Sequence, residues 1–334
     1  MMQMARHATQ RLARRLAQRW ILGAALAVAI PLSAVSQGPP DAALKRIRMV
    51  TVATADVAAA EAWYAKWLDY KPARRGKISD RMASSWALLG MTGRDYALMQ
   101  PASGEDVYLR IAAIDPVTKP VPLIGWGWTA IEIGVTDVDA SFAKLKQSGA
   151  EVLAPPDGIG VGTIRAFQVK GPAGEVLYLT GNTGDRLKSN HPELKSAIDR
   201  PFIMVMGGPD RAALKAFYRD TFRLGDQGDL SLNVRVINTA FKRPATEKTD
   251  LSVLTMSERG NKLEIDQLPP GAVERPKTMG QLPPGIAMVS FSVANVDTLP
   301  VAWRNPPDFT YGKVRAGTLS GPAGELIELV EDRK

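Results

Sequence analysis

The pattern of apolar and polar positions predicts a strand followed by an amphipathic helix at several places along the chain. Residues 48–53 favour a strand, and Asp56 begins a stretch in which apolar residues recur with helical spacing. The same order returns at residues 129–135, which predict a strand, and at Asp137, where the next helix begins. Both aspartates suit the first position of a helix, because their side chains accept hydrogen bonds from the free amides of the first turn.

The second half of the chain repeats this order. Residues 202–206 and 288–293 predict strands, and Asp210 and Asn295 stand where the following helices are expected to begin. Each helix is followed by several short runs typical of strands, which in the first unit are residues 85–90, 96–100 and 107–112. The predicted unit is a strand, a helix and about three further strands, repeated four times along the chain.

Three short strings occur twice, in the same order and at nearly the same offset. Gly-Pro-Ala-Gly-Glu occupies residues 171–175 and 321–325, a spacing of 150, and opens a strand-like run each time. The other pairs, spaced by 154 and 158 residues, are Ala-Trp-Tyr at 62–64 with Ala-Phe-Tyr at 216–218, and Val-Asp at 138–139 and 296–297. Repeats of this period predict two halves of about 150 residues. Since no helix follows Gly-Pro-Ala-Gly-Glu, the string is a turn and not a phosphate-binding loop.

Residues 1–36 have the features of an export signal. Five arginines and no acidic residue precede an apolar run over residues 20–32, and small residues follow at 34–36. The run is short for a membrane span, so we expect a cleaved signal peptide and a periplasmic or secreted protein, with an uncleaved anchor as the alternative. Removing the five arginines lowers the formal net charge from +8 to +3. We therefore expect neither nucleic-acid binding nor stable membrane insertion of the mature chain.

Composition removes several kinds of chemistry. The chain has no cysteine, which excludes thiolate metal sites, disulfides and cysteine nucleophiles. It has 2 histidines, and only His191 lies outside the export signal. His191 falls in residues 184–199, which we expect to link the two halves, and we expect its imidazole to be exposed to solvent.

The repeated units resemble the vicinal oxygen chelate superfamily, which includes glyoxalase I, bleomycin-resistance proteins and extradiol dioxygenases. The resemblance covers residues 46–183 and 200–331, which are the two predicted domains. It is carried by Val135-Thr136-Asp137-Val138-Asp139-Ala140 with Gly149, by Ala216-Phe217-Tyr218-Arg219-Asp220 with Gly225, and by the run from Gly321 to Leu329. It implies an α+β fold in which four βαβββ modules form two glyoxalase-like domains with cupped, mostly antiparallel sheets, and two clefts.

The resemblance also indicates which positions face the clefts. In metal-dependent members, ligands lie on the first and last strands of each module; here the first-strand positions are Met49, Ala130, Ile203 and Met288. None of these side chains is a useful ligand for a hard or borderline divalent cation. The last-strand positions are Arg110, Tyr178, Glu264 and Glu328. With at most two carboxylates in the second half, we predict no metal and no other cofactor.

The remaining groups suggest recognition of an anion. Arg110 shares a strand face with Tyr108, and in the expected cleft of the first half it would lie across from Tyr178, so the three could hold a carboxylate, phenolate or enolate. Trp128 and Met49 would supply an apolar lining. The alternative reading is that Arg110 lies on a solvated strand face or pairs with Glu105 or Asp106, and that the aromatic residues belong to the core.

Two glutamates are candidates for proton transfer, with Tyr178 as the third catalytic candidate. Glu328 lies between Leu326 and Val330 on its strand face, where burial would raise its pKa. Glu264 stands beside Lys262 and Asp266, a polar setting in which we expect it to stay ionised. Two carboxyls in different environments are typical of an acid–base pair. Otherwise they are remnants of the family pattern, or pair with Arg235 or Lys262.

Three functions follow from these expectations. The first is an exported, metal-independent enzyme of lyase, decarboxylase or isomerase type, acting on a small apolar or aromatic organic acid or a phenolic compound. The second is a non-catalytic protein that sequesters such a molecule, as bleomycin-resistance members do. The third is a glyoxalase-like or dioxygenase-like metalloenzyme. The expected partner is a small molecule, and a homodimer stays open.

Overall fold

The computed structural model describes residues 38–117, 121, 123–158, 163–184 and 190–332. The predicted signal peptide, residues 1–36, lies outside these residues, so its prediction stays untested. Among the described helices, none combines the length and the apolar character that crossing a membrane requires.

The described chain consists of four modules in the predicted order. The first contains β1 (Ile47–Thr54), α2 (Val57–Leu68), β2 (Lys71–Lys77), α3 (Asp80–Ser85), the 3₁₀ turn η1 (Leu89–Met91), β3 (Asp95–Gln100) and β4 (Tyr108–Ala113). The second contains β5 (Gly127–Val135), α4 (Val138–Lys146), β6 (Val152–Gly158), β7 (Ile164–Lys170) and β8 (Val176–Asn182). Both begin with the predicted strand and helix.

The third and fourth modules follow the same plan. The third contains β9 (Ile198–Gly208), α5 (Arg211–Phe222), β10 (Gly225–Leu232), α6 (Arg235–Ala240), β11 (Thr249–Thr255) and β12 (Lys262–Gln267). The fourth contains β13 (Gly285–Val293), the 3₁₀ turn η3 (Val296–Thr298), β14 (Asp308–Tyr311), β15 (Val314–Ser320) and β16 (Leu326–Glu331). The mixed α+β class and the four-module organisation are thereby confirmed.

The predicted helix starts are confirmed at three of four positions. The side chains of Asp56, Asp137 and Asp210 accept hydrogen bonds from the third backbone amide beyond them, at 2.9, 3.0 and 2.9 Å. Asn295 instead begins only η3, and the expected helix is absent from the described fourth module. Prolines at 300, 306 and 307 explain this, because they cannot continue a helix.

The predicted strand at residues 85–90 is also wrong. Ser79 caps α3, its hydroxyl accepting the Met82 amide at 3.2 Å, and the chain then turns through Trp86 into η1. Trp86 and Leu88, two of the apolar residues that suggested a strand, are buried against the concave face of a sheet, so tertiary packing decides the local structure here.

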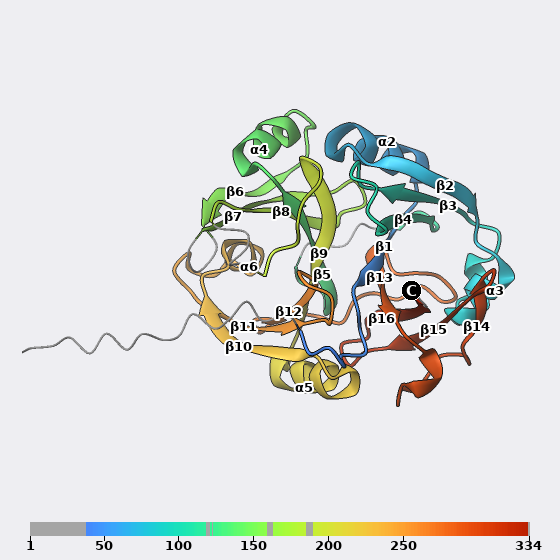
Figure 1. Cartoon of the computed structure of the whole chain (residues 1–334). Helices are drawn as coiled ribbons and strands as arrows, with labels where there is room; N and C mark the ends of the chain where they lie inside the picture. The colour runs from blue at the N-terminus through green and yellow to red at the C-terminus, as the bar shows by residue number, and fades with distance from the viewer. Residues whose placement is uncertain (1–37, 118–120, 122, 159–162, 185–189, 333–334) are drawn as a thin grey trace, which may run out of the picture. The chain divides into compact units, whose positions relative to one another are not determined.

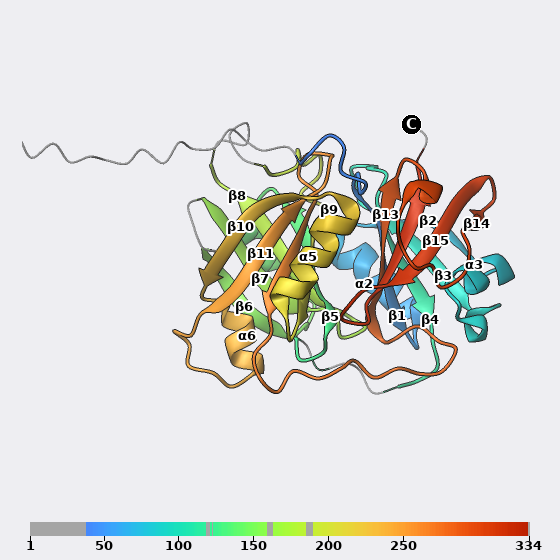
Figure 2. The same cartoon turned by 90° about the horizontal axis from the view of Figure 1, so that it is seen from below.

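The modules pair differently from the prediction (Figures 1 and 2). One sheet has the order β14-β15-β16-β13-β1-β4-β3-β2, and the other has the order β10-β11-β12-β9-β5-β8-β7-β6. The first module therefore shares a sheet with the fourth, and the second with the third. Each predicted half, 46–183 or 200–331, contributes four strands to both sheets, so the expected clefts built from consecutive modules are wrong. The four modules have similar sequence patterns, so these patterns do not show which two modules share a sheet.

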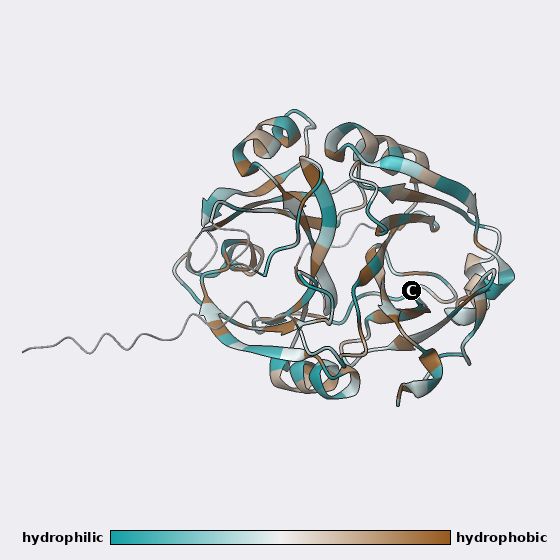
Figure 3. Ribbon diagram, in the orientation of Figure 1, coloured by the Kyte–Doolittle hydropathy of each residue, from teal (hydrophilic) through white to brown (hydrophobic). Residues whose placement is uncertain are grey.

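The main core lies between the sheets and the helices α2, α4 and α5. It is built from apolar side chains of the central strands, and Figure 3 shows that the edge strands β2 and β10 are largely hydrophilic by comparison. Trp128 is among its largest residues, with ring centroids 6.3 and 6.1 Å from those of Tyr218 and Phe291. Its indole nitrogen donates to the Leu326 carbonyl at 2.9 Å. Burial of these rings holds the two sheets back to back.

The repeated sequence strings contact one another in this core. The Tyr218 hydroxyl donates to the Glu325 carboxylate at 2.6 Å, and Tyr64 makes the equivalent bond to Glu175. Each glutamate also accepts the backbone amide two residues before it. The Ala-aromatic-Tyr and Gly-Pro-Ala-Gly-Glu strings are thus two sides of one buried contact that occurs twice and joins consecutive modules.

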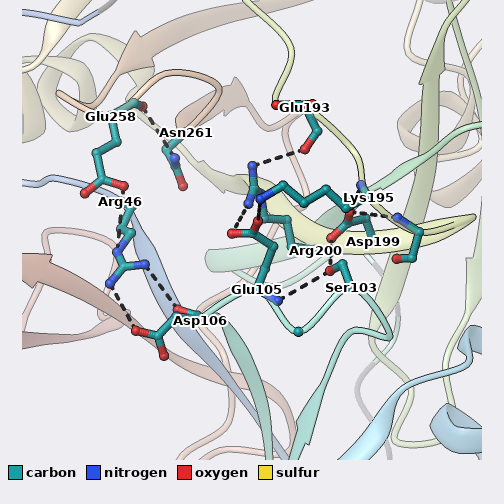
Figure 4. A network of polar contacts seen from close by, with 12 residues as sticks. Arg46, Ser103, Glu105, Asp106, Glu193, Lys195, Asp199, Arg200, Glu258 and Asn261 are labelled. Carbon is teal, nitrogen blue, oxygen red and sulfur yellow. Dashed lines mark hydrogen bonds and ion pairs between the residues drawn. The ribbon is translucent and has the colours of Figure 1, made fainter.

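A polar network joins the β3–β4 connection to the chain that leads into β9 (Figure 4). Glu105 pairs with Lys195 at 2.7 Å and with Arg200, and Ser103 donates to Asp199 at 2.8 Å. Asp199 in turn accepts the Lys195 backbone amide at 2.6 Å. The network crosses from one sheet to the other and fixes their relative position, together with the apolar core.

Candidate functional site

Each sheet has a concave face that encloses a cavity. We call the concave face of the sheet containing β1 and β13 cup I, and that of the sheet containing β5 and β9 cup II. Cup I holds a cavity of about 260 Å³ and cup II one of about 270 Å³. The two predicted clefts therefore exist, with different partners on their walls.

A short helix from one module covers part of each cup. In cup I, Met82 of α3 and the following Trp86 pack on inner residues such as Met288 and Leu326. In cup II, Val236 and Ile237 of α6 pack with Ala130, Tyr178 and Val205. Because α3 and α6 occupy equivalent places in the first and third modules, the cups share one plan and differ in their side chains.

Cup I is dominated by a buried ion pair between the first and fourth modules. The Arg110 guanidinium donates to the Glu328 carboxylate at 3.3 Å, to the Thr51 hydroxyl at 3.0 Å and to the Tyr311 hydroxyl at 2.5 Å. It also lies over the Trp86 ring, 4.5 Å from the ring centroid. Burial alone would lower the pKa of Arg110, but Tyr311 and Glu328 outweigh it and raise that pKa.

Glu328 is fully buried and completely occupied by donors. Besides Arg110, it accepts Trp86 Nε1 at 2.8 Å, the Tyr311 hydroxyl at 2.6 Å and the Ser290 hydroxyl at 2.5 Å. Four hydrogen-bond donors on one carboxylate are enough to explain Glu328 as a structural residue. Its predicted role in proton transfer stays a prediction.

Arg110, Tyr108 and Met49 line the cup I cavity together, as the sequence suggests. The alternative partners of Arg110 are excluded by the geometry: Glu105 pairs with Lys195 and Arg200, and Asp106 pairs with Arg46 and Arg48. Tyr178 lies in cup II, so the predicted joint grip of Arg110 and Tyr178 on one anion is wrong.

Cup II is lined by aliphatic side chains and by a set of ionisable ones. Glu132, Tyr178, Lys262 and Glu264 all border its cavity. Glu132 on β5 stands opposite Tyr178 on β8 and opposite Ile203 on β9. Lys262 and Glu264 alternate along β12 with core residues and so share the concave face with Asp266. Groups from the second and third modules therefore meet across the central strands.

Crowding and burial raise the pKa values of the carboxyl groups. Burial raises the pKa of Glu132 from 4.5 to about 7, and the pKa of Asp266 from 3.8 to about 7. Burial, followed by the charges of Asp266 and Glu132, holds the pKa of Glu264 well above its usual range. Burial lowers the pKa of Lys262. The expectation that a polar setting keeps Glu264 ionised is therefore wrong, because its neighbours are themselves acidic and buried.

One buried carboxyl group on the concave face of cup II, that of Asp266, lacks a hydrogen-bond partner within the described residues. Both carboxylate oxygens of Asp266 are buried and accept no hydrogen bond, and the residue is 1% exposed. Lys262 makes no ion pair with any described carboxylate. A buried polar group without a partner costs free energy, so Asp266 points to a site that a ligand or water completes.

Neither Glu132 nor Asp266 was predicted as a site residue. Glu132 is the one charged residue in the otherwise apolar stretch 128–135, and that contrast was an available signal. His191 was predicted to be exposed, and this is wrong: it is 8% exposed, borders cup II and lies 5.1 Å from the Phe202 ring. Trp128, predicted as a lining residue, borders neither cup cavity and belongs to the core.

The donor set of neither cup fits a divalent metal. In cup I the Arg110 guanidinium occupies the Glu328 carboxylate, and the neighbouring first-strand residues at that level are Thr51 and Ser290. In cup II the ammonium of Lys262 lies among the carboxyls, and no group of three potential ligand residues has metal-site geometry in the part of the chain described. The absence of a metal from both cups stays a prediction.

Two cupped sheets, each built from two βαβββ modules around its own cavity, define a tandem βαβββ protein. Residues 46–178 match the family described as the Glyoxalase/Bleomycin resistance protein/Dioxygenase superfamily. Glyoxalase I from Zea mays has a similar fold, with a TM-score of 0.59 at 14% identity over 86% of this chain and 92% of that one. A putative dioxygenase from Bacillus subtilis subsp. subtilis str. 168 gives a TM-score of 0.61 at 10% identity, over 87% of this chain and 86% of that one. A comparison with curated proteins finds no match.

The match to this superfamily covers residues 46–178, and the solved structures share the fold over 86–87% of the chain. At 10–14% identity the solved structures show the fold alone. The chemistry has to be argued from the cups themselves.

Proposed function

We propose that cup II binds a small neutral phenolic or carbonyl compound and catalyses proton transfer on it, as an isomerase or lyase. The observation that carries this proposal is the convergence of Glu132, Lys262 and Glu264 on one largely aliphatic cavity, with pKa values moved from their ordinary positions. Groups with a pKa near the working pH transfer protons most effectively, and such shifts are typical of functional sites.

Proton transfer beside a carbonyl group needs two partners. One group takes a proton from the carbon next to the carbonyl, and another gives a proton to the carbonyl oxygen, so an enol forms without oxidant or reductant. Crowded carboxyls can fill both roles, since mutual repulsion keeps one protonated while another is ionised. We assign these roles to Glu132 and Glu264.

Tyr178 is suited to the part of a hydrogen-bond donor. Burial, and then the charges of Asp266, Glu264 and Glu132, raise its pKa well above the usual value, so it keeps its proton. A phenol that borders the cavity can donate to the developing oxyanion. The predicted catalytic residues Tyr178 and Glu264 thus stay together in this proposal, with Glu132 added and Glu328 left to cup I.

The walls of cup II favour a neutral ligand. Side chains such as Ile203, Leu251 and Val253 border the cavity, and its volume of about 270 Å³ suits a compound of one ring. The three carboxyl groups in the lining, those of Glu132, Asp157 and Glu264, outnumber the cations Lys262 and Arg235, so an organic acid would meet no net positive charge there. This favours phenolic and carbonyl compounds over the organic acids that were also expected.

The second candidate is binding without turnover. The aliphatic walls and the His191–Phe202 ring pair would also hold an apolar molecule for sequestration. The two functions differ in one measurable property, because only an enzyme exchanges the substrate's acidic carbon-bound hydrogens with solvent.

Deuterium exchange tests the proposal without knowledge of the natural substrate. Phenylacetone and 3-cyclohexen-1-one are incubated with the protein in D₂O, and the label beside the carbonyl is followed by NMR. We expect exchange above the buffer rate, and a loss of about 10²-fold or more in Glu264→Gln and in Glu132→Gln. Glu151→Gln is the matched control, since Glu151 lies on the surface in an ion pair with Lys170.

The outcome separates the two candidates. A probe that raises the thermal transition temperature but exchanges only at the buffer rate supports sequestration and contradicts the enzyme. Exchange that survives both glutamine variants would show that the acid cluster does not carry the chemistry.

A further inference from the structure

The two cups have the same plan but differ in the charged side chains on their walls. The cup I cavity is bordered by three arginines, Arg48, Arg74 and Arg110, and by no carboxylate side chain. The cup II cavity is bordered by the carboxyl groups of Glu132, Asp157 and Glu264 together with the cations Lys262 and Arg235. One chain therefore offers two cavities of similar size that should attract different ligands.

We propose that cup I is a second ligand site, which takes a small aromatic carboxylate through Arg74 and Arg110. This site is separate from the proton-transfer site of cup II and does not depend on it.

The arginines of cup I differ in how far their charge is already balanced. Arg110 is paired with Glu328, and Arg48 donates to the Asp106 carbonyl at 3.0 Å and forms an ion pair with its carboxylate. Arg74 makes no ion pair with any described residue and is exposed at the cavity border. Arg74 therefore supplies the net positive charge of the site, and it has the freedom to close on a ligand.

Arg110 keeps part of its binding capacity. Its guanidinium has five N–H groups, and three of them serve Thr51, Tyr311 and Glu328. The other two have no hydrogen-bond partner among the described residues, although the group borders the cavity. A carboxylate is the complementary acceptor, because guanidinium N–H groups match its two oxygens.

The rest of the cavity favours an aromatic body on that carboxylate. Tyr96 and Tyr108 contribute rings, and Met49, Leu98 and Val330 contribute apolar surface. The Tyr108 ring is itself held in place by Arg48, whose guanidinium carbon lies 5.7 Å from the ring centroid. A volume of about 260 Å³ limits the ligand to about one ring with a short substituent.

The edge strand β2 provides a matched pair of test residues. Arg74 borders the cup I cavity, whereas the adjacent Arg75 points to the opposite face and donates to Glu61 of α2 at 3.0 Å. Both side chains are exposed, so replacing either by glutamine removes one surface charge without disturbing the core.

The test is binding of 4-fluorobenzoate to the full chain, measured by ¹⁹F NMR and calorimetry at low salt. We expect saturable binding that is about tenfold weaker in Arg74→Gln and unchanged within twofold in Arg75→Gln. Neutral 4-fluorobenzamide should bind at least tenfold more weakly than the carboxylate. Raising the ionic strength should weaken binding to the unsubstituted protein more than to Arg74→Gln.

Three results would overturn the second site. These are no saturable binding of 4-fluorobenzoate, equal binding by the Arg74→Gln and Arg75→Gln variants, or a loss in Glu264→Gln as large as in Arg74→Gln. The last variant also separates the two proposals, since it removes a cup II residue and should leave benzoate binding intact. If deuterium exchange is absent while benzoate still binds, the proposed function of cup II is wrong and the ligand site of cup I stands.

Discussion

Glu132→Gln should stabilise the protein at alkaline pH and leave it unchanged at acidic pH. The carboxyl of Glu132 is 5% exposed and burial raises its pKa from 4.5 to about 7. Below pH 4.5 the group is protonated in both the folded and the unfolded chain, and it contributes no pH-dependent difference. Between pH 4.5 and 7 the folded chain keeps a proton that the unfolded chain has released, so stability falls as pH rises.

The size of the effect follows from the two pKa values. Each tenfold change in an acid dissociation constant corresponds to about 1.4 kcal/mol, so a rise from 4.5 to about 7 costs about 3 kcal/mol once pH exceeds 7. Glutamine has nearly the same shape and cannot ionise. We therefore compare the free energy of unfolding of the Glu132→Gln variant with that of the unsubstituted protein at each pH. The difference, variant minus unsubstituted protein, should be about 3 kcal/mol larger at pH 8 than at pH 4.5.

Urea unfolding at pH 4.5 and pH 8, for the unsubstituted protein and the variant, measures this difference. Comparing the two pH values cancels any constant cost of burying an amide. Glu151→Gln serves as the control, and its change between the two pH values should stay within about 0.5 kcal/mol, because exposed ion pairs contribute little. Parallel stability profiles for Glu132→Gln and the unsubstituted protein would refute the reasoning.

Three further predictions concern the core and the N-terminus. Arg110→Met leaves Glu328 buried without its cation, so chemical denaturation should show that the free energy of unfolding falls by about 3–5 kcal/mol. Adding Glu328→Gln should recover much of this loss. A loss under about 1 kcal/mol would contradict a stabilising role of the ion pair. Gly321→Ala places a methyl carbon 1.8 Å from the Glu325 carboxylate, so it should break the hydrogen bonds of that carboxylate and lower the free energy of unfolding by about 2 kcal/mol. Gly158→Ala is the control, because its methyl group meets open space and should change little in the same assay. The exported chain should lack residues 1–36, and N-terminal sequencing that recovers this segment would contradict a cleaved signal.

Sequence patterns were sufficient for most of the local elements and for the class of fold. Helical spacing and the aspartate caps at 56, 137 and 210 determine structure within a few residues, so the sequence contains that information directly. The failure at Asn295 has the same local origin, because the prolines that follow were not weighed against the cap. The failure at residues 85–90 is different, since Trp86 is placed by contacts with Glu328 and Arg110, which are distant in sequence.

The pairing of modules could not be predicted from the repeats. Four similar units carry the same apolar faces, and nothing local distinguishes β13 from β5 as the neighbour of β1. Which modules pair determines which residues line each cup. This pairing separated Arg110 from Tyr178, brought Glu328 to Arg110, and brought Glu132 to Glu264. The strand faces that point into the cups were nevertheless predicted correctly, because alternation along a strand is local.

The two cups differ in what happens to their buried charges, and this difference indicates where function lies. In cup I, Arg110 and Glu328 are held by each other and by four further side chains, so the ion pair is compensated and serves the fold. The net positive charge of cup I therefore comes from Arg74 at its border, and Arg110 adds only the N–H groups that the ion pair leaves free. In cup II, Asp266 lacks hydrogen-bond partners among the described residues, and Glu132 and Glu264 repel each other, an arrangement that destabilises the fold above neutral pH. A protein retains such a cost where the unsatisfied groups are needed for a ligand, which is why we place the proton-transfer chemistry there.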